Sequence, residues 1–233
     1  MVYIAPGGGG GINHIPLDGS ELNAIAVWPG DSATDIGPSN FVLDLDTVVI
    51  TSNGNYTGTH DCFDISTIQL LGTTEGVASG AAFQIPVATD ITIAGMFFIT
   101  ATESTPYFIS NSLQETNISY ALVSVTGQLN YQTSAGIDNT NRISPAGCWA
   151  HFAAVSTSSR TSTKVYVNGV NEGGTLATTA TTPHADSELY IGTVDATNGD
   201  HARSCCDILI ADTAYTDAQI RTLAENAFGH ELP

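Results

Sequence analysis

The last third of the chain constrains its fold more than any other part. Residues 148–155 are apolar on both alternating faces, as expected of a strand buried in a sandwich. Residues 164–167 alternate strictly between polar and apolar side chains and run into Asn168-Gly169. This dipeptide is the strongest short hairpin signal, because both residues tolerate a positive φ. The pattern therefore predicts antiparallel strands joined by a tight turn.

A third strand and a closing helix follow this hairpin. Residues 188–192 repeat the strand alternation. Thr216 and Gln219 have the spacing of a capping box, which marks the start of a helix. The apolar residues that follow at helical spacing are Ile220, Leu223, Ala224 and Ala227. We therefore expect a short C-terminal helix.

The composition favours an all-β fold. The chain is rich in Thr, Ser, Gly, Val and Ile and poor in Lys, Arg, Glu and Leu, which long helices would favour. With 233 residues it is long enough for one large sandwich with an ample core. An apolar content of 42% excludes general disorder.

Four short motifs occur in an order that is typical of one family. They are W-x-H-x-A from Trp149, K-V-Y-V-N-G from Lys164, L-Y-I-G from Leu189 and T-D-A-Q-I from Thr216. In this order they resemble the laminin-G-like branch of the concanavalin A-like lectin and glucanase superfamily. Residues 82–98 fit the early strands of that family, although Met96 stands where a Trp is common. The resemblance covers about residues 65–228 and implies an antiparallel jelly-roll β-sandwich.

The chain divides at about residue 24. Residues 1–23 hold five consecutive glycines and show no helical or strand period. Glycine loses the most entropy on ordering, so we expect residues 1–23 to form an extended arm and not part of the core. We expect residues 24–233 to form the jelly-roll domain. We expect the arm to be pinned against another chain of an assembly, with pinning on its own domain as the alternative. The expected anchors are Ile4, Gly7, Gly8, Gly9, Gly10, Gly11, Ile12, Ile15 and Leu17.

The charge narrows the classes of partner. Five Lys and Arg against 23 Asp and Glu give a net charge of −18. Such a surface repels phosphate backbones and anionic lipid headgroups, so we expect neither nucleic-acid nor membrane binding. The sequence begins without the basic region and apolar run of a secretory signal and nowhere approaches 18 consecutive apolar residues. We therefore expect no signal peptide and no transmembrane segment.

Catalytic motifs are absent from the sequence. Glucanases of the resembled superfamily carry two Glu flanking an Asp, because retaining hydrolysis needs two carboxylates about 5–5.5 Å apart. No E-x-D-x-x-E, G-x-S-x-G or H-E-x-x-H occurs here. Asp44 and Asp46 could share one face of a strand, but a solvated strand end is the favoured interpretation. We expect a protein that is not an enzyme.

Metal and disulfide signals are weak. The histidines and cysteines lack zinc spacing, and we expect His151 to be a hydrogen-bonded core imidazole. The oxygen-rich loop 195–200 could hold calcium, and a plain turn is the favoured alternative. Its candidate ligands are Asp195, Asn198 and Asp200. No cofactor is otherwise required. Cys148 and either Cys205 or Cys206 are expected to be buried thiols, with a bridge between them as the alternative.

Strand phase suggests where a glycan would bind. Tyr166 and Tyr190 alternate with aliphatic residues, so they face outward or into the concave sheet if the aliphatic side chains face the core. Tyr120 and Tyr131 are possible companions, and such rings could stack on sugars. Cross-strand pairs that stabilise the sheet are the alternative. The residues expected to share one core are Trp149, Phe152, Val165, Val167, Leu189 and Ile191.

Two classes of function follow from these observations. The first is a non-enzymatic display protein, most simply a virion component such as a capsid decoration or head-fibre protein. It would be tethered by its arm, would form a homo-oligomer and could touch host glycans. The second is a carbohydrate-binding lectin or tail adhesin. A glycoside hydrolase is a distant third.

Overall fold

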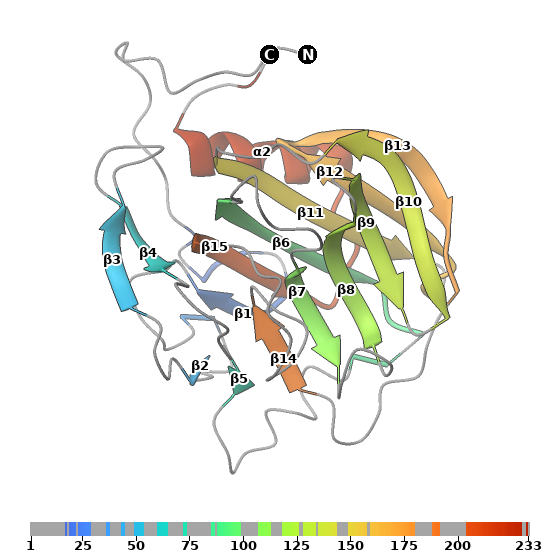
Figure 1. Ribbon diagram of the computed structural model, residues 1–233, viewed down its shortest axis with the longest axis horizontal. Helices are drawn as coiled ribbons and strands as arrows, with labels where there is room; N and C mark the ends of the chain where they lie inside the picture. Colours follow the sequence, from blue (N-terminus) through green and yellow to red (C-terminus); the bar gives the residue numbers. More distant parts are fainter. Residues whose placement is uncertain are drawn as a thin grey trace.

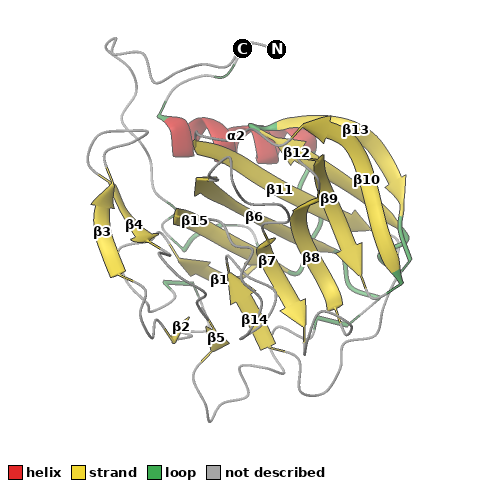
Figure 2. Ribbon diagram, in the orientation of Figure 1, coloured by secondary structure: helices red, strands yellow, loops and turns green. Residues whose placement is uncertain are grey.

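A computed structural model shows the chain folded into β-sheets with a helix against the larger one (Figures 1 and 2). It describes residues 17, 19–21, 23–28, 36–37, 43–44, 49–53, 60–64, 72–73, 85–86, 88–98, 107–112, 118–125, 128–133, 135–143, 149–157, 159–179, 188–191, 204–229 and 232.

The larger sheet has eight strands. They are β1 (Ala24–Trp28), β3 (Val49–Asn53), β4 (His60–Asp64), β6 (Ile91–Phe98), β11 (Trp149–Thr157), β12 (Ser162–Val167), β13 (Val170–Ala177) and β15 (Ser204–Ala211). Their order is β13-β12-β11-β6-β15-β4-β3, and β1 also pairs with β15. Every pair in this sheet is antiparallel.

The smaller sheet has five strands in the order β10-β9-β8-β7-β14. They are β7 (Tyr107–Ser112), β8 (Ile118–Val125), β9 (Gln128–Thr133), β10 (Gly136–Ile143) and β14 (Glu188–Ile191). A two-stranded ribbon joins β2 (Leu43–Asp44) to β5 (Gly72–Thr73). These pairs are antiparallel as well. The predicted antiparallel jelly-roll sandwich is therefore confirmed.

The main core lies between the two sheets. Phe152 of β11 stacks on Phe108 of β7, with ring centroids 4.5 Å apart, and Phe97 of β6 lies 5.0 Å from Phe108. Burying each side chain of this size stabilises the fold by about 1.5–3 kcal/mol. Of the expected core residues, this cluster contains Phe152, Val165, Leu189 and Ile191, with Val167 packed against it.

One helix, α2 (Asp217–Phe228), follows β15. Its start is the predicted capping box, because the Thr216 side chain accepts from the Gln219 amide at 3.3 Å and the Thr216 amide donates to Gln219 Oε1 at 2.8 Å. Its C-cap, Gly229, has φ 69°, the left-handed conformation that glycine favours. Figure 1 shows the helix lying along the larger sheet.

Helix α2 covers the outer face of the larger sheet. Ala153 and Val155 of β11 pack with Ile220 of α2, and Trp149 packs with Met96, Cys206 and Ala227. The expectation that Trp149 belongs to the core between the sheets is therefore wrong. The odd-numbered residues of β11 face the helix and the even-numbered ones face the second sheet. This explains why the strand is apolar on both faces.

The predicted hairpin at Asn168-Gly169 joins β12 to β13. Both residues have a positive φ, 49° and 75°. Asn168 also extends the ladder with β11, because its Oδ1 accepts from the His151 amide at 3.0 Å and its amide donates to the His151 carbonyl at 2.8 Å. A Cβ at Gly169 would lie 2.9 Å from Arg221 Cα, so the hairpin also needs glycine because α2 packs directly on it.

Leu17 lies on its own domain. Its side chain is buried against Val27 and Leu209, and its amide donates to Oδ1 of Asp207 at 3.5 Å. Asp207 is held at φ 50° where the register of β15 against β6 shifts, which is the geometry of a β-bulge. The expectation that Leu17 anchors the arm on a partner is therefore wrong. The other expected anchors, in residues 1–16, lie outside the described residues.

Candidate ligand-binding site

The four tyrosines expected to bind glycans are all buried. Tyr120, Tyr131 and Tyr166 have no exposed area, and Tyr190 is 5% exposed. Tyr120 and Tyr131 belong to the core between the sheets, and Tyr166 packs under α2. A ring without an exposed face cannot stack on a sugar, so the expectation that these tyrosines bind glycans is wrong.

A surface pocket of about 350 Å³ lies on the helix-covered side of the larger sheet. This volume is within the range of small-molecule sites, about 300–1,000 Å³. The lining residues come from the ends of β11 and β12 and from the connection that leads into α2. They are Val155, Thr157, Ser162, Lys164, Ala214, Tyr215, Thr216 and Asp217.

Strand alternation supplies the floor of the pocket. Val155 and Thr157 follow Ala153 on the helix-facing side of β11, and Ser162 and Lys164 occupy the same side of β12. The registry of the two antiparallel strands pairs Val155 with Lys164 and Thr157 with Ser162. The four floor residues are therefore two cross-strand pairs.

A buried threonine of β6 fixes the wall of the pocket. The hydroxyl of Thr92 donates to the carbonyl of Thr213 at 2.7 Å and accepts from the amide of Tyr215 at 3.0 Å. Thr92 has no exposed area. These two bonds hold the segment between β15 and α2 against the sheet, so Thr216 and Asp217 are placed beside β12.

An ion pair spans the pocket from floor to wall. Lys164 Nζ lies 2.7 Å from Asp217 Oδ1, and the hydroxyl of Tyr166 donates to the same oxygen at 2.8 Å. The bond from Lys164, followed by that from Tyr166, holds the pKa of the Asp217 carboxyl below its usual value. Burial, followed by the bond to Asp217, raises the pKa of Tyr166. The carboxylate is therefore ionised and the phenol neutral at pH 7.

The rest of the lining is uncharged and includes the apolar side chains of Val155 and Ala214. Ser162 carries a hydroxyl, whereas the hydroxyls of Thr157 and Thr216 already donate to the Ser162 carbonyl at 3.4 Å and to Gln219 Oε1 at 2.9 Å, so towards a ligand they are acceptors. Burial, with the charge of Glu21 as the second cause, raises the pKa of Tyr215 to about 12. Tyr215 is therefore also neutral at pH 7. An ammonium, a carboxylate and several hydroxyls in one pocket suit a ligand that itself carries many hydroxyls.

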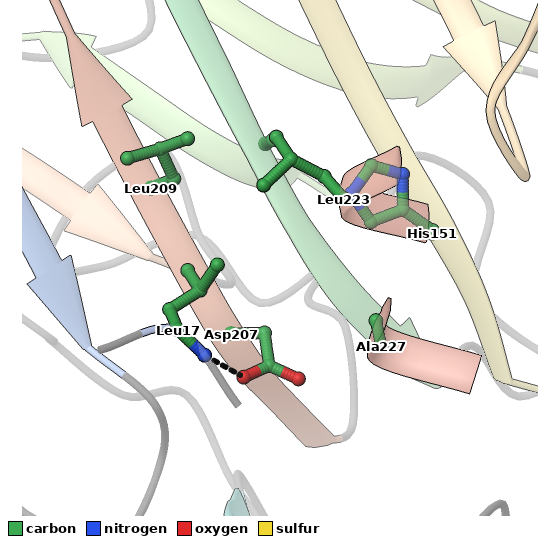
Figure 3. Close-up of a pocket in the computed structure, with 7 residues that line it drawn as sticks. Leu17, His151, Asp207, Leu209, Leu223 and Ala227 are labelled. Atoms are coloured by element: carbon green, nitrogen blue, oxygen red, sulfur yellow. Dashed lines mark hydrogen bonds between the residues drawn. The ribbon is translucent and has the colours of Figure 1, made fainter. Parts of the chain in front are cut away.

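A second, much smaller cavity lies beneath α2 (Figure 3). Its volume is about 10 Å³, which is space for about one water molecule. His151 lines it on one side, and the bonded pair of Leu17 and Asp207 lies on the other. Among the described residues no group hydrogen-bonds to the buried Nδ1 of His151, so these residues do not supply the expected full satisfaction of this imidazole. Burial lowers the pKa of His151 to about 3.

The remaining candidate sites lie partly outside the described residues. Asp195, Asn198 and Asp200, the expected calcium ligands, and Asp46 lie outside the described residues. Within the described residues, no three His, Cys, Asp or Glu side chains are close enough to share a metal ion. Cys205 and Cys206 are buried on opposite faces of β15, and Cys148 is not described. In the same described ranges, no helix has the length and apolarity that a membrane span needs.

A sequence profile of the concanavalin A-like lectin/glucanases superfamily matches residues 71–221, more than half of the chain. The chain belongs to this superfamily. Among curated proteins, no relative of significant sequence similarity is found.

Solved structures share the fold of this lectin-like sandwich. Trypanosoma rangeli sialidase in complex with 2,3-difluorosialic acid is 15% identical, with a TM-score of 0.59 over 87% of this chain and 33% of that one. The receptor-binding domain of botulinum neurotoxin C/D mosaic serotype is 11% identical, with a TM-score of 0.61 over 90% and 55%. The binding domain of Paraclostridial Mosquitocidal Protein 1 is 13% identical, with a TM-score of 0.59 over 90% and 55%.

At these identities the likeness concerns the fold alone. The chain spans between about a third and just over half of the lengths of these structures. What each of them binds or cleaves therefore says nothing direct about the pocket described above.

Sequence reasoning did not single out the pocket. In the sequence, Lys164 stands out only as part of a strand, and Thr216 and Asp217 only as part of a helix start. Lys164 and Asp217 are 53 positions apart in the chain. The one local signal was that Lys164 and Tyr166 share a strand face, which places two donors side by side.

Proposed function

We propose that this protein is a non-catalytic carbohydrate-binding module and that the pocket between β12 and the start of α2 holds the sugar. The observation that carries the proposal is the lining itself, which combines hydroxyls, an ionised carboxylate and an ammonium in about 350 Å³. Membership of a lectin and glucanase superfamily supports the same class of ligand.

The same lining argues against glycoside hydrolysis at this pocket. Glycosidases need two carboxylates flanking the scissile bond, one of them protonated to serve as the acid. Among the described residues that line the pocket, Asp217 is the single carboxylate, and its lowered pKa keeps it ionised. Incubation with β-glucans and with a sialylated oligosaccharide should therefore release no sugar. Sustained release by pure protein would contradict the non-catalytic proposal.

A pocket-filling substitution tests the location of the sugar. Ala214→Trp places a large ring in the pocket, whereas Ala135→Trp places the same ring at an exposed turn of the smaller sheet. We expect saturation-transfer NMR with a panel of sugars to show binding by the wild type and Ala135→Trp and loss of binding by Ala214→Trp. Equal binding by both variants would place the sugar elsewhere.

We further propose that the module is displayed on a larger assembly such as a virion, tethered by the residues that precede Leu17. The support is the run of five glycines and the net charge of −18, which suits a solvent-facing module. The test removes residues 1–16 and keeps Leu17, which is buried in the domain. The truncated protein should keep its melting temperature and lose incorporation into its parent particle. Normal incorporation would end the display hypothesis.

A further inference from the structure

The charges in the pocket cancel. Among the described lining residues, Lys164 is the single cation and Asp217 the single anion, and they are paired at 2.7 Å. Outside the pocket the chain carries a large excess of acidic residues, with a net charge of −18. The pocket therefore offers no uncommitted positive charge to a ligand.

The ion pair nevertheless leaves hydrogen-bonding capacity unused. Asp217 Oδ1 accepts from both Lys164 and Tyr166, and its carboxylate also interacts with the backbone amide of Asp217 itself. A carboxylate has about four acceptor positions and this side chain is 61% exposed, so it can still accept from a ligand through Oδ2. An ammonium has three donors, and Lys164 spends one of them on Asp217. An acceptor therefore lies directly beside spare donors.

Two adjacent hydroxyl groups of a sugar complement this arrangement. One hydroxyl can donate to Asp217 Oδ2 while the oxygen of its neighbour accepts from Lys164 Nζ. Both bonds involve a charged group, and such bonds are stronger than bonds between neutral groups. Neither bond requires the ion pair to open.

An acidic sugar meets the opposite situation. Its carboxylate would compete with Asp217 for Lys164 and would stand next to the Asp217 carboxylate, and like charges at such distances repel. The surrounding acidic surface adds to this repulsion, in part screened by salt.

We infer that the pocket selects uncharged sugars that present two adjacent hydroxyl groups and discriminates against acidic sugars, through Asp217 and Lys164. This inference rests on the proposed carbohydrate-binding function of the same pocket.

Matched sugar pairs test the selectivity. Glucose with glucuronic acid, and galactose with galacturonic acid, differ in one carboxylate, and their binding at pH 7 can be compared by saturation-transfer NMR and calorimetry. We expect at least one neutral member to bind about tenfold or more tightly than its acidic partner. Equal or tighter binding of the acidic member would overturn the selectivity and leave the carbohydrate-binding proposal intact. Binding of no member, and of no sugar in a wider panel, would overturn the proposed function itself.

A matched pair of carboxylate variants tests the assigned residue. Asp217→Asn removes the charge in the pocket, and we expect it to weaken neutral-sugar binding by about tenfold or more. Glu225→Gln is the control, because Glu225 also lies on α2 and is paired with Arg221 at 2.9 Å but does not line the pocket. Thermal melting of both variants checks that α2 is retained. Unchanged affinity in folded Asp217→Asn would overturn the assignment of this carboxylate.

Discussion

At the scale of single residues, the buried polar side chains of His151 and Tyr166 show how burial changes the pKa of a group. His151 is 2% exposed under α2, and no group of the described residues hydrogen-bonds to its Nδ1. Burial of the imidazole disfavours its charged form, which is why its pKa falls to about 3. Tyr166 is equally buried, but its hydroxyl reaches Asp217 at 2.8 Å. His151 therefore makes the stability of the fold sensitive to acid, and Tyr166 positions the carboxylate of Asp217 in the pocket.

His151 should make the folded state less stable in mild acid. The pKa is about 3 in the folded chain and about 6.5 in the unfolded chain, so the unfolded chain binds the proton first as pH falls. The contribution of neutral His151 is therefore complete above pH 6.5 and is lost progressively towards pH 3. Between pH 6.5 and 5, urea unfolding should show a loss about 1.5 kcal/mol larger for the wild type than for His151→Leu. Equal losses of unfolding free energy in the two proteins would contradict His151 as the source of this acid sensitivity.

Tyr166→Phe should change the pH dependence of sugar binding. The hydroxyl of Tyr166 stabilises the ionised form of Asp217, so its removal raises the pKa of that carboxyl towards the usual value. Binding that requires ionised Asp217 should then be lost at a higher pH in the variant than in the wild type. Calorimetric titrations between pH 3 and 7 would measure the shift, with Tyr190→Phe as a control in the other sheet. If sugar binding is lost at the same pH in the variant and the wild type, Tyr166 acts only through packing.

At the scale of elements, α2 buries the outer face of the larger sheet. The helix seals the face of β11 and β6 that the second sheet does not reach, and the hairpin between β12 and β13 packs against it. The pocket exists because the segment entering the helix is bonded to β6 through Thr92. Contact between a hairpin and a helix that follows it by some fifty positions thus shapes both the fold and the site.

Substitutions at two glycines, Gly169 in the hairpin before β13 and Gly174 in β13, can distinguish the cost of a left-handed backbone from the cost of contact with α2. Gly169 and Gly174 have nearly the same φ, 75° and 71°, but a Cβ would meet Arg221 Cα at 2.9 Å in the first and no atom within 4 Å in the second. Gly174→Ala should cost about 1–2 kcal/mol from the left-handed backbone alone. Gly169→Ala should cost about 1–3 kcal/mol more, because the helix must shift. Chemical denaturation measures the loss of unfolding free energy in both variants. Equal losses would show that α2 moves away from the new Cβ without a cost in stability.

At the scale of the whole molecule, charge imbalance is the dominant property. The excess of acidic residues gives a net charge of −18, and such repulsion opposes the compact state. The described ion pairs, Lys164 with Asp217 and Arg221 with Glu225, are both partly exposed and therefore weak sources of stability. The packed clusters on both faces of the larger sheet are what hold the chain together.

Salt should therefore stabilise this protein at neutral pH. Raising NaCl from about 10 to about 150 mM shortens the screening length from about 30 to about 8 Å and so weakens the long-range repulsion. We expect calorimetry at pH 7 to show a rising melting temperature over this range. Near pH 4, where about half of the ordinary carboxyls are protonated, the same series should have a smaller effect. A melting temperature independent of NaCl at pH 7 would contradict this account.

Local patterns in the sequence were sufficient for the strands at residues 148–155, 164–167 and 188–192, for the Asn168-Gly169 hairpin and for the capping box at Thr216. These features depend on alternation, on φ preferences and on side chains three positions apart, all of which act between near neighbours. Only the tertiary structure decided which element covers which face. Trp149 packs under α2, and Tyr166 lies beneath the helix with its hydroxyl on Asp217. Strand phase defines two faces but not their neighbours, because a neighbour is chosen by packing between segments far apart in the chain.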